Sequence, residues 1–337
     1  MSGVLVVMEH QDQNRTGSPS LTRISLEALA AGQHLAKELG IDCSAAIPGE
    51  GLASLVEQLA AKSIAKVFAV EHTLLTHYTA DGYVHALQQL IQKVTPAYVL
   101  FPHTYRVRDF APALATRFQQ VLISDVIAIH TSSGGGPTFV RQLFQGKLNA
   151  DYRPIASQQA PCFVSVQAGS FRADSLEIPP TPAHVESFAV NLTPAQIRTT
   201  PSAPFRESAH TVDLVAAPII VSVGRGIREQ DNIPLVQALA EALGAELAAS
   251  RPICDAGWLP MERQVGSSGQ TVSPKLYLAV GISGAIQHLV GMKGSKTIIA
   301  INKDENAPIF EVADYGVAGD LFEIVTALTK AIIAAKG

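Results

Sequence analysis

Residues 276–288 read LYLAVGISGAIQH. The apolar run Leu276–Val280 is typical of a buried strand, Gly281 and Gly284 permit a tight turn, and the residues after them begin a helix. Such a turn presents unpaired N–H groups and the positive helix end to an anion or an electron-rich ring edge. The stretch therefore predicts a strand–loop–helix unit with a ligand at the carboxyl end of its strand. The alternative for His288, in the first helical turn, is a purely structural histidine.

Five further segments of similar character lie on either side of this stretch in the sequence. Residues 224–226 read GRG, residues 249–251 read ASR, and residues 264–269 read QVGSSG, whereas 302–304 and 314–320 supply polar groups suited to a ribose or an adenine edge. Each segment alone could be an ordinary turn or polar surface loop. Together they predict a dinucleotide site at the strand ends of an α/β domain. No GxGxxG opens the first helix of either domain, so NAD specificity has no direct support.

Outward from these loops, the chain alternates strand-like and helix-like segments, which predicts α/β domains with largely parallel sheets flanked by helices. In the C-terminal half, Pro218–Val223 and Ile298–Ile301 read as strands, and 232–243 and 319–335 read as helices. The same rhythm fills the N-terminal half, where strand–helix pairs are expected at 4–7 and 24–39, 44–47 and 52–61, 66–70 and 83–94, and 98–101 and 110–118.

Two regions interrupt the rhythm. From Val121 to Phe171 short strand-like runs predict antiparallel additions to the sheet edge. Between Ile178 and Phe205, six prolines favour a connecting segment over a helix. We therefore expect an N-terminal α/β domain over 1–207, with antiparallel additions and a proline-rich linker, and a second, Rossmann-like α/β domain over 208–337.

Composition excludes several classes of protein. The 337 residues are 47% hydrophobic with a formal net charge of -4, which lacks the basic excess that nucleic-acid binding needs. The three cysteines show no CxxC spacing that would indicate a metal site. No apolar stretch has membrane-spanning length, and the chain starts without a signal or transit segment. A cytoplasmic protein without metal, nucleic acid or membrane insertion is expected.

The N-terminal half offers few candidates for chemistry. His103, Arg106, Arg108 and Asp109 follow the expected strand at 98–101, where α/β proteins often bind ligands. The simpler interpretation is a solvated loop in which Asp109 caps the next helix. No GxSxG elbow, HExxH or Walker A loop is present, so nothing here indicates hydrolysis.

The C-terminal half closely resembles the electron-transfer flavoprotein alpha subunit. The matching strings are collinear and include residues 224–226, 249–251, 255–257, 264–266, 277–289, 296–304 and 307–316. They cover almost all of the second domain. The first domain resembles the family in its strand–helix rhythm and in short pieces such as Arg108-Asp109 and Gly146-Lys147.

The resemblance implies one FAD in the second domain and a beta subunit that completes a heterodimer at the flavin. Arg225 and Ser250 would hold the pyrophosphate, Arg251 would lie against the isoalloxazine ring, Ser268 near N5 and His288 at the C2 carbonyl. Ser283 and Gln287 would contact the phosphate and ribityl parts, and Asn302 and Asp320 the adenosine. The other expected contacts are Gln264, Val265, Gly266, Ser267, Gly281, Gly284, Ala285 and Ile286. The family often has Gln-Thr where this chain has Ser267-Ser268, so the flavin potential could differ while the hydroxyl near N5 is kept.

The function implied is electron transport rather than catalysis of a substrate's conversion. Electrons would come from flavoprotein dehydrogenases, such as the acyl-CoA dehydrogenases of fatty acid β-oxidation, and pass through an anionic flavin semiquinone to a membrane quinone oxidoreductase or another acceptor. Alternatives are an FAD- or nucleotide-dependent enzyme with substrate near His103 and Asp109, a binding module with a structural nucleotide, and an electron-bifurcating member of the same family. Whether the beta subunit carries AMP or a second FAD separates the last of these from a simple carrier.

Overall fold

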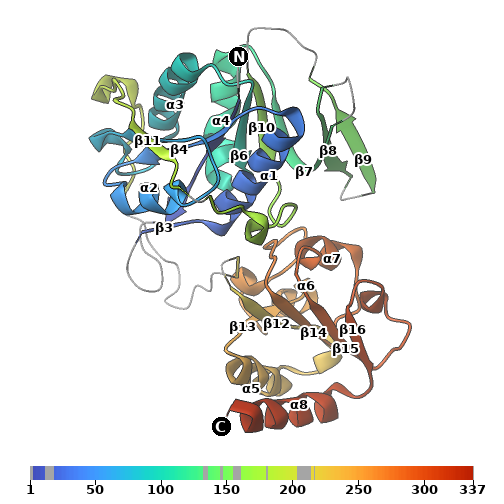
Figure 1. Ribbon diagram of the computed structural model, residues 1–337. Coiled ribbons are helices and arrows are strands. Elements are labelled where there is room, and N and C mark those ends of the chain that lie inside the picture. Colours follow the sequence, from blue (N-terminus) through green and yellow to red (C-terminus); the bar gives the residue numbers. More distant parts are fainter. Residues whose placement is uncertain are drawn as a thin grey trace. The chain divides into compact units, whose positions relative to one another are not determined.

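The computed structural model describes residues 3–11, 19–131, 136–144, 147–154, 161–179, 181–202, 214–215 and 217–336. The chain forms two compact units, Met1–Pro204 and Phe205–Gly337 (Figure 1). The expected boundary between residues 207 and 208 lies outside the described residues. In the part of the chain that is described, no helix is both long and apolar enough to cross a membrane.

The first unit is built on a nine-stranded sheet with the strand order β11-β5-β4-β1-β6-β10-β7-β8-β9 within the described residues. In that order the strands are His184–Ser187, Lys66–Glu71, Cys43–Gly49, Val4–Val7, Tyr98–Pro102, Cys162–Val166, Leu122–His130, Thr138–Leu143 and Leu148–Tyr152. Neighbours are parallel from β11 through β7, and the pairs β7–β8 and β8–β9 are antiparallel. Two short strands of two residues each, β2 (His10–Gln11) and β3 (Ser20–Leu21), pair with each other outside this sheet.

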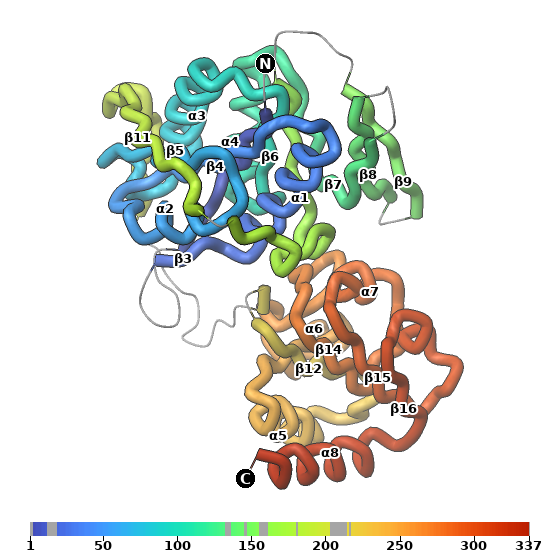
Figure 2. The backbone as a smooth tube through the Cα atoms, in the orientation of Figure 1, coloured from blue at the N-terminus to red at the C-terminus, as the bar shows by residue number. Residues whose placement is uncertain are grey.

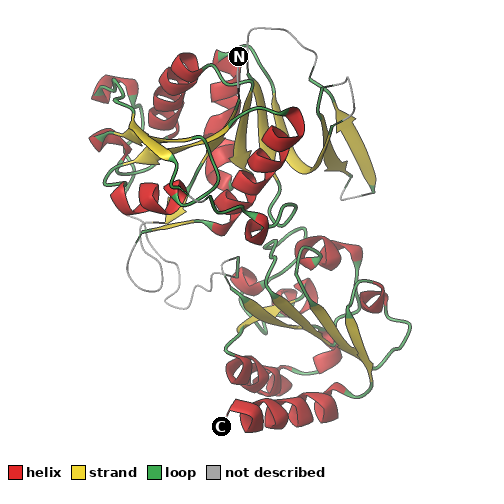
Figure 3. Cartoon of the chain, in the orientation of Figure 1, coloured by secondary structure: helices red, strands yellow, loops and turns green. Residues whose placement is uncertain are grey.

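Helices cover both faces of this sheet (Figure 3). Helices α1 (Arg23–Leu39) and α2 (Ala53–Ala60) pack on the face that carries Val4 and Val6. Helices α3 (Ala80–Val94) and α4 (Tyr105–Arg117) pack on the face that carries Leu5 and Val7. The continuous apolar run in β1 thus supplies two cores, as expected for a parallel strand covered on both sides.

Three expectations for this unit need correction. β10 is a parallel strand between β6 and β7 and not an antiparallel addition to the edge, in keeping with its buried apolar side chains. Helix α4 begins at Tyr105, with Thr104 as its N-cap, so Asp109 lies inside the helix and caps nothing. Part of the proline-rich segment is strand β11, which pairs with β5.

The second unit contains a five-stranded parallel sheet in the order β13-β12-β14-β15-β16. These strands are Glu246–Ala249, Ile219–Val223, Leu276–Val280, Ile298–Asn302 and Tyr315–Ala318. Helices α5 (Ile233–Leu243) and α8 (Leu321–Lys336) contribute to the core on one face, and α7 (Ile286–Met292) to the core on the other. The short helix α6 (Arg251–Asp255) follows β13, and Figure 2 shows the path of the chain.

The sequence did not reveal β16, which lies inside the segment 314–320 that was expected to supply polar groups. Its four residues are all exposed and alternate little in polarity, so they lack the pattern of a half-buried strand. The predicted fold class, α/β with largely parallel sheets flanked by helices, is confirmed.

Candidate functional site

The carboxyl ends of all five strands of the second sheet lie at one edge, because the strands are parallel. Arg225 follows β12, Ser250 and Arg251 follow β13, and Gly281 follows β14. Asn302 ends β15, and Asp320 follows β16. The chain passes from β12 to β13 on one side of it, and then crosses back to β14 on the other side of β12. The order of the strands therefore changes direction between β12 and β14. Ligands of open α/β sheets bind at such a switch point.

Glycines allow the loops after β12 and β14 to touch at the switch point. A Cβ atom on Gly224 would lie 2.4 Å from the Gly281 carbonyl oxygen, and one on Gly226 would lie 2.7 Å from Gly281 Cα. The Gly226 amide donates a hydrogen bond to that same carbonyl at 3.0 Å. The two loops are therefore fixed against each other by backbone alone, which leaves the edge open to a close approach by a ligand.

The β14 loop presents backbone donors at this edge. Gly284 has a φ of +90° and sits against residue 309, whose amide donates to the Ser283 carbonyl at 3.1 Å. Among the residues that the structure describes, the amides of Ser283, Gly284 and Ala285 donate no hydrogen bond. Ser283 and Ala285 are exposed. Successive backbone N–H groups in a turn can create an anion-binding concavity, and this loop offers three such groups.

The loop at 264–270 packs against the start of α7, which brings two separately predicted segments together. The Ser267 amide donates to the Gln287 carbonyl at 2.7 Å, and a Cβ atom on Gly291 would lie 2.4 Å from the Gly266 nitrogen. Gln264 is buried, and its Nε2 donates to Ser268 Oγ at 2.9 Å. The Ser268 hydroxyl is thereby oriented as an acceptor toward Gln264, which leaves its own proton for a ligand.

His288 lies in the first turn of α7 and is only 6% exposed. Its Nε2 is 2.9 Å from the hydroxyl of Tyr277 on β14. Its Nδ1, and Oε1 of Gln264, are buried atoms that have no hydrogen-bond partner among the described residues. Burial lowers the pKa of His288 to about 4, and the nearby Val265 carbonyl offsets part of this effect. His288 is therefore a neutral imidazole at pH 7.

The remaining predicted side chains are partly engaged within the protein. Arg251 pairs with Asp255 at 3.2 Å on an exposed surface. Asn302 donates to the Ile282 carbonyl at 2.8 Å, which ties the β14 loop to β15. Asp320 accepts from the Phe322 amide at 2.8 Å at the start of α8. Arg225 is exposed, Ser250 and Val265 are buried, and Ile286 is 60% exposed beside His288.

Sequence reasoning missed three residues that shape this site. Tyr277 lies in the strand and partners His288, Gly291 receives the 264–270 loop, and Ile309 supports the turn at Gly284. Only Tyr277 had a local signal in the sequence: it places a hydroxyl group in an otherwise apolar strand, where that hydroxyl needs a hydrogen-bond partner. The other two contacts are tertiary and leave no mark on the spacing of residues.

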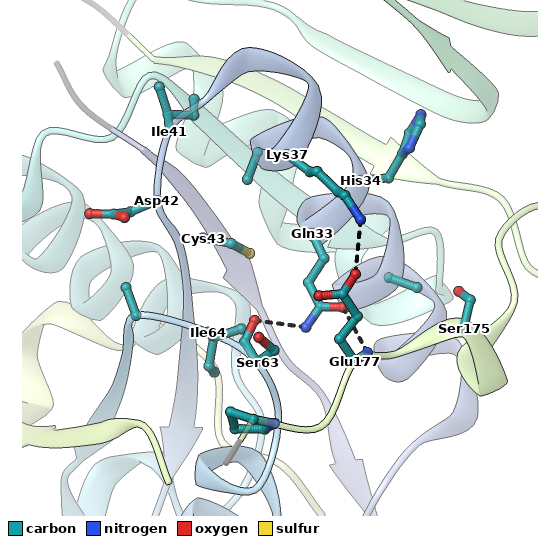
Figure 4. Close-up of a pocket in the computed structure, with 14 residues that line it drawn as sticks. Gln33, His34, Lys37, Ile41, Asp42, Cys43, Ser63, Ile64, Ser175 and Glu177 are labelled. Atoms are coloured by element: carbon teal, nitrogen blue, oxygen red, sulfur yellow. Dashed lines mark hydrogen bonds and ion pairs between the residues drawn. The ribbon is translucent and has the colours of Figure 1, made fainter. Parts of the chain in front are cut away.

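Two pockets of the first unit do not match this arrangement. A pocket of about 580 Å³ is lined in part by Gln33, Lys37, Cys43 and Glu177 (Figure 4). Lys37 and Glu177 face each other there at 3.1 Å, so their charges are already paired. Burial raises the pKa of the Cys43 thiol to about 12, which makes it a poor nucleophile at neutral pH.

The other pocket, of about 430 Å³, is lined in part by His103 and Arg108. His103 Nδ1 lies 2.9 Å from Ser165 Oγ, whereas Asp109 accepts a 2.7 Å hydrogen bond from Tyr78. His103 and Asp109 thus have separate partners and do not form an acid–base pair. Burial lowers the pKa of His103, and the Asp125 carboxylate acts in the opposite direction.

The depressed pKa of His288 predicts a pH-dependent stability. The unfolded histidine binds a proton near pH 6.5 and the folded one near pH 4, so the stability is fully present above pH 6.5 and is lost as the pH falls toward 4. Between pH 7 and pH 5 we expect a loss of roughly 2 kcal/mol from this group. In His288→Asn the dependence of the unfolding free energy on pH should become shallower by that amount.

Urea denaturation at pH 7 and pH 5 measures the unfolding free energy of the second unit, and hence the effect. His130→Asn, which replaces a histidine of the first unit, is the control and should leave the second unit's transition unchanged. An undiminished slope in His288→Asn would show that the imidazole is already charged in the folded protein.

Comparison with known proteins gives consistent matches to both units. Residues 4–193 match the family model described as the electron transfer flavoprotein domain, and residues 213–293 match the electron transfer flavoprotein FAD-binding domain. The chain is 38% identical over 313 residues to an electron transfer flavoprotein subunit alpha of Bacillus subtilis, covering 92% of this chain and 93% of that protein. It is 38% identical over 339 residues to the corresponding Mycobacterium tuberculosis subunit, with full coverage of both. It is also 36% identical over 339 residues to the acryloyl-CoA reductase electron transfer subunit beta of Anaerotignum propionicum, covering 93% and 92%.

Proposed function

Because this chain belongs to the electron transfer flavoprotein family, we propose that it is the alpha subunit of a heterodimer and carries electrons on one FAD bound at the switch point of its second sheet. The bound flavin supplies the redox chemistry, since it can accept and release electrons singly or in pairs. The protein binds the FAD, orients it and, through nearby charges and hydrogen-bond donors, stabilises negative charge on its ring. No step of this function needs a substrate to be converted on the chain itself.

The observation that carries the proposal is the set of unused polar groups at the strand ends. The amides of 283–285 donate no hydrogen bond among the described residues, and His288 Nδ1 and Gln264 Oε1 are buried without partners. Buried polar atoms without partners are rare in folded proteins and indicate a missing ligand or water. Backbone amides suit a pyrophosphate, and a buried donor beside an oriented hydroxyl suits the polar edge of a flavin.

Each predicted contact keeps its role within this proposal. Arg225, Ser250 and the free amides would hold the pyrophosphate, and Arg251, Ser268 and His288 would face the ring. Ser283 and Gln287 would contact the phosphate and ribityl parts, and Asn302 and Asp320 the adenosine. Contacts to the loop backbone would come from Gln264, Val265, Gly266, Ser267, Gly281, Gly284, Ala285 and Ile286.

The side chains proposed to face the flavin ring, Arg251 and His288, would stabilise negative charge on that ring in different ways. Arg251 carries a fixed positive charge and can leave its exposed partner Asp255 at little cost, because exposed ion pairs contribute about 0 to 1 kcal/mol. His288 is neutral, so it acts as a hydrogen-bond donor and not as a counter-charge. Helix α7 has seven residues, which limits its dipole. Stabilisation of a reduced ring therefore depends on Arg251 and on directed N–H groups.

Two sets of partners are consistent with this role. In the first, flavoprotein dehydrogenases such as acyl-CoA dehydrogenases reduce the carrier, and a quinone oxidoreductase oxidises it. The relative from Anaerotignum propionicum, named as an electron transfer subunit of an acryloyl-CoA reductase, favours a second role within a reductase complex or a bifurcating system.

Co-expression with a beta subunit tests the proposal. We expect one FAD per heterodimer on the alpha chain, turnover only when a dehydrogenase is added, and a higher thermal midpoint when the beta subunit is present. A second flavin on the beta subunit would favour the bifurcating role. Conversion of a substrate by the heterodimer alone, or a flavin that cannot be reduced by light, would overturn the carrier role.

Limited proteolysis provides an independent prediction about where the FAD binds. Cleavage between the two units should leave the flavin with the C-terminal fragment or its complex with the beta subunit, because all the proposed contacts lie after residue 213. Size-exclusion chromatography with detection at a flavin wavelength measures this. Flavin that elutes only with the N-terminal fragment would disprove the location.

A further inference from the structure

Tyr277 is buried completely in the second sheet and contacts His288. Its side chain is 0% exposed, and its hydroxyl lies 2.9 Å from His288 Nε2. Ser222, on the neighbouring strand β12, is the diagonal neighbour of Tyr277 on the same face, since Ile220 pairs with Tyr277 and Ser222 with Ala279. Burial raises the pKa of Tyr277, and the Ser222 hydroxyl offsets part of the rise.

The protons of this buried pair can be assigned by accounting for donors and acceptors. A phenol must donate its proton when it is fully buried, or the unpaired group costs about 1 to 3 kcal/mol. The Ser222 hydroxyl makes no well-formed hydrogen bond among the described residues, and its lowering of the Tyr277 pKa is the effect of a donor, so it does not take that proton. His288 Nε2 is the acceptor within reach, and it can accept only as an unprotonated nitrogen.

The second ring nitrogen then carries the proton of the neutral imidazole. With Nε2 as acceptor, His288 Nδ1 is an N–H group; the Val265 carbonyl lies near the imidazole, but Nδ1 makes no well-formed hydrogen bond among the described residues. The reverse arrangement would leave the Tyr277 proton unpaired and would make Nδ1 a lone-pair acceptor in place of a donor. Such a lone pair would repel a ring carbonyl oxygen, which offers only lone pairs itself.

We propose that Tyr277 is a positioning residue that holds His288 in the tautomer with its proton on Nδ1, so that this N–H is the donor offered to the polar edge of the FAD ring. The inference rests on the proposed function for the identity of the ligand. It extends that function by naming the strand residue that selects the donor. Tyr277 itself does not touch the FAD.

Nitrogen-15 NMR of histidine-labelled protein tests the tautomer directly. In the unmutated heterodimer with oxidised FAD, His288 should show the shifts of a protonated Nδ1 and an unprotonated Nε2, with His288→Asn used for assignment. The same measurement on the FAD-free heterodimer should give the same tautomer, because the selection comes from Tyr277. An Nε2-protonated ring in both samples would overturn the proposal, whether or not FAD is bound.

Tyr277→Phe removes the hydroxyl and keeps the aromatic packing. With full FAD occupancy, the two His288 tautomers should become mixed, and the equilibrium constant for the first one-electron reduction should fall about threefold to tenfold, the range of one ordinary hydrogen bond. Ser222→Ala is the matched control, since it removes a neighbouring buried hydroxyl and should leave the tautomer and the equilibrium constant unchanged. A purely structural Tyr277 would lower stability only, so unchanged nitrogen shifts and equilibrium constant in Tyr277→Phe would refute the inference. Failure of the unmutated protein to bind FAD would instead count against the proposed function.

Discussion

The Gly284→Ala variant is expected to lose tight FAD binding and to destabilise the second unit by roughly 2 to 4 kcal/mol. The residue has a φ of +90°, and a Cβ atom there would lie 2.2 Å from the backbone nitrogen of Ile309. An alanine in a left-handed conformation costs about 1 kcal/mol, and overpacking adds about 1 to 3 kcal/mol. Relief of the clash must move residues 283–285, whose amides are the proposed phosphate donors.

Gly244→Ala provides the matched control in the same unit. Gly244 also has a positive φ, of +68°, but a Cβ atom there would meet nothing within 4 Å. This variant should therefore show only the conformational cost of about 1 kcal/mol and should bind FAD normally. Chemical denaturation and flavin titration of the heterodimer measure both quantities. Equal affinities for FAD in the two variants would show that the β14 loop does not hold the phosphates.

The His288→Ala variant should lower the first reduction potential of the bound flavin by roughly 60 to 130 mV. A hydrogen bond to a charged group contributes about 1.5 to 3 kcal/mol, and about 59 mV corresponds to about 1.4 kcal/mol for one electron. The amides of 283–285 and Arg251 remain in the variant, so FAD should stay bound. Spectroelectrochemical titration of the heterodimer measures the potential.

Met292→Ala separates this effect from a loss of packing. Met292 is fully buried on the same helix and in the same core, but it carries no donor for the flavin. Its truncation should destabilise the unit and leave the potential nearly unchanged. A drop of the same size in both variants would show that the cavity, and not the imidazole, moves the potential.

Most of the fold was predictable because its signals are local. The apolar run Val4–Val7 and the helix that ends at Gly40 identify a parallel strand and its covering helix, and Gly40 does adopt the left-handed conformation of a helix C-cap. The errors came where local signals are weak. The polar first turn of α4 looked like a loop, and the exposed strand β16 has no buried face.

The site was predictable in its loops but not in its contacts. Glycines and hydroxyl residues after apolar runs located Gly281, Gly284 and Ser268. The contact of Tyr277 with His288, and the neutral state of that histidine, depend on burial within the assembled sheet and could not be read from spacing. The individual roles of the predicted FAD contacts remain predictions.

The position of β11 bears on how the first unit avoids self-association. Without residues 184–187, which form one of the nine strands, β5 would become the edge of the sheet and present an unpaired row of backbone donors and acceptors, which is a template for intermolecular strand addition. β11 replaces this with a strand of four residues that carries His184 and Glu186, with Glu186 paired to Lys66 at 3.2 Å. Short, charged edges resist docking of a second chain. A version of the protein truncated before residue 184 should therefore aggregate through β5, even though the cores on both faces of the sheet would be nearly complete.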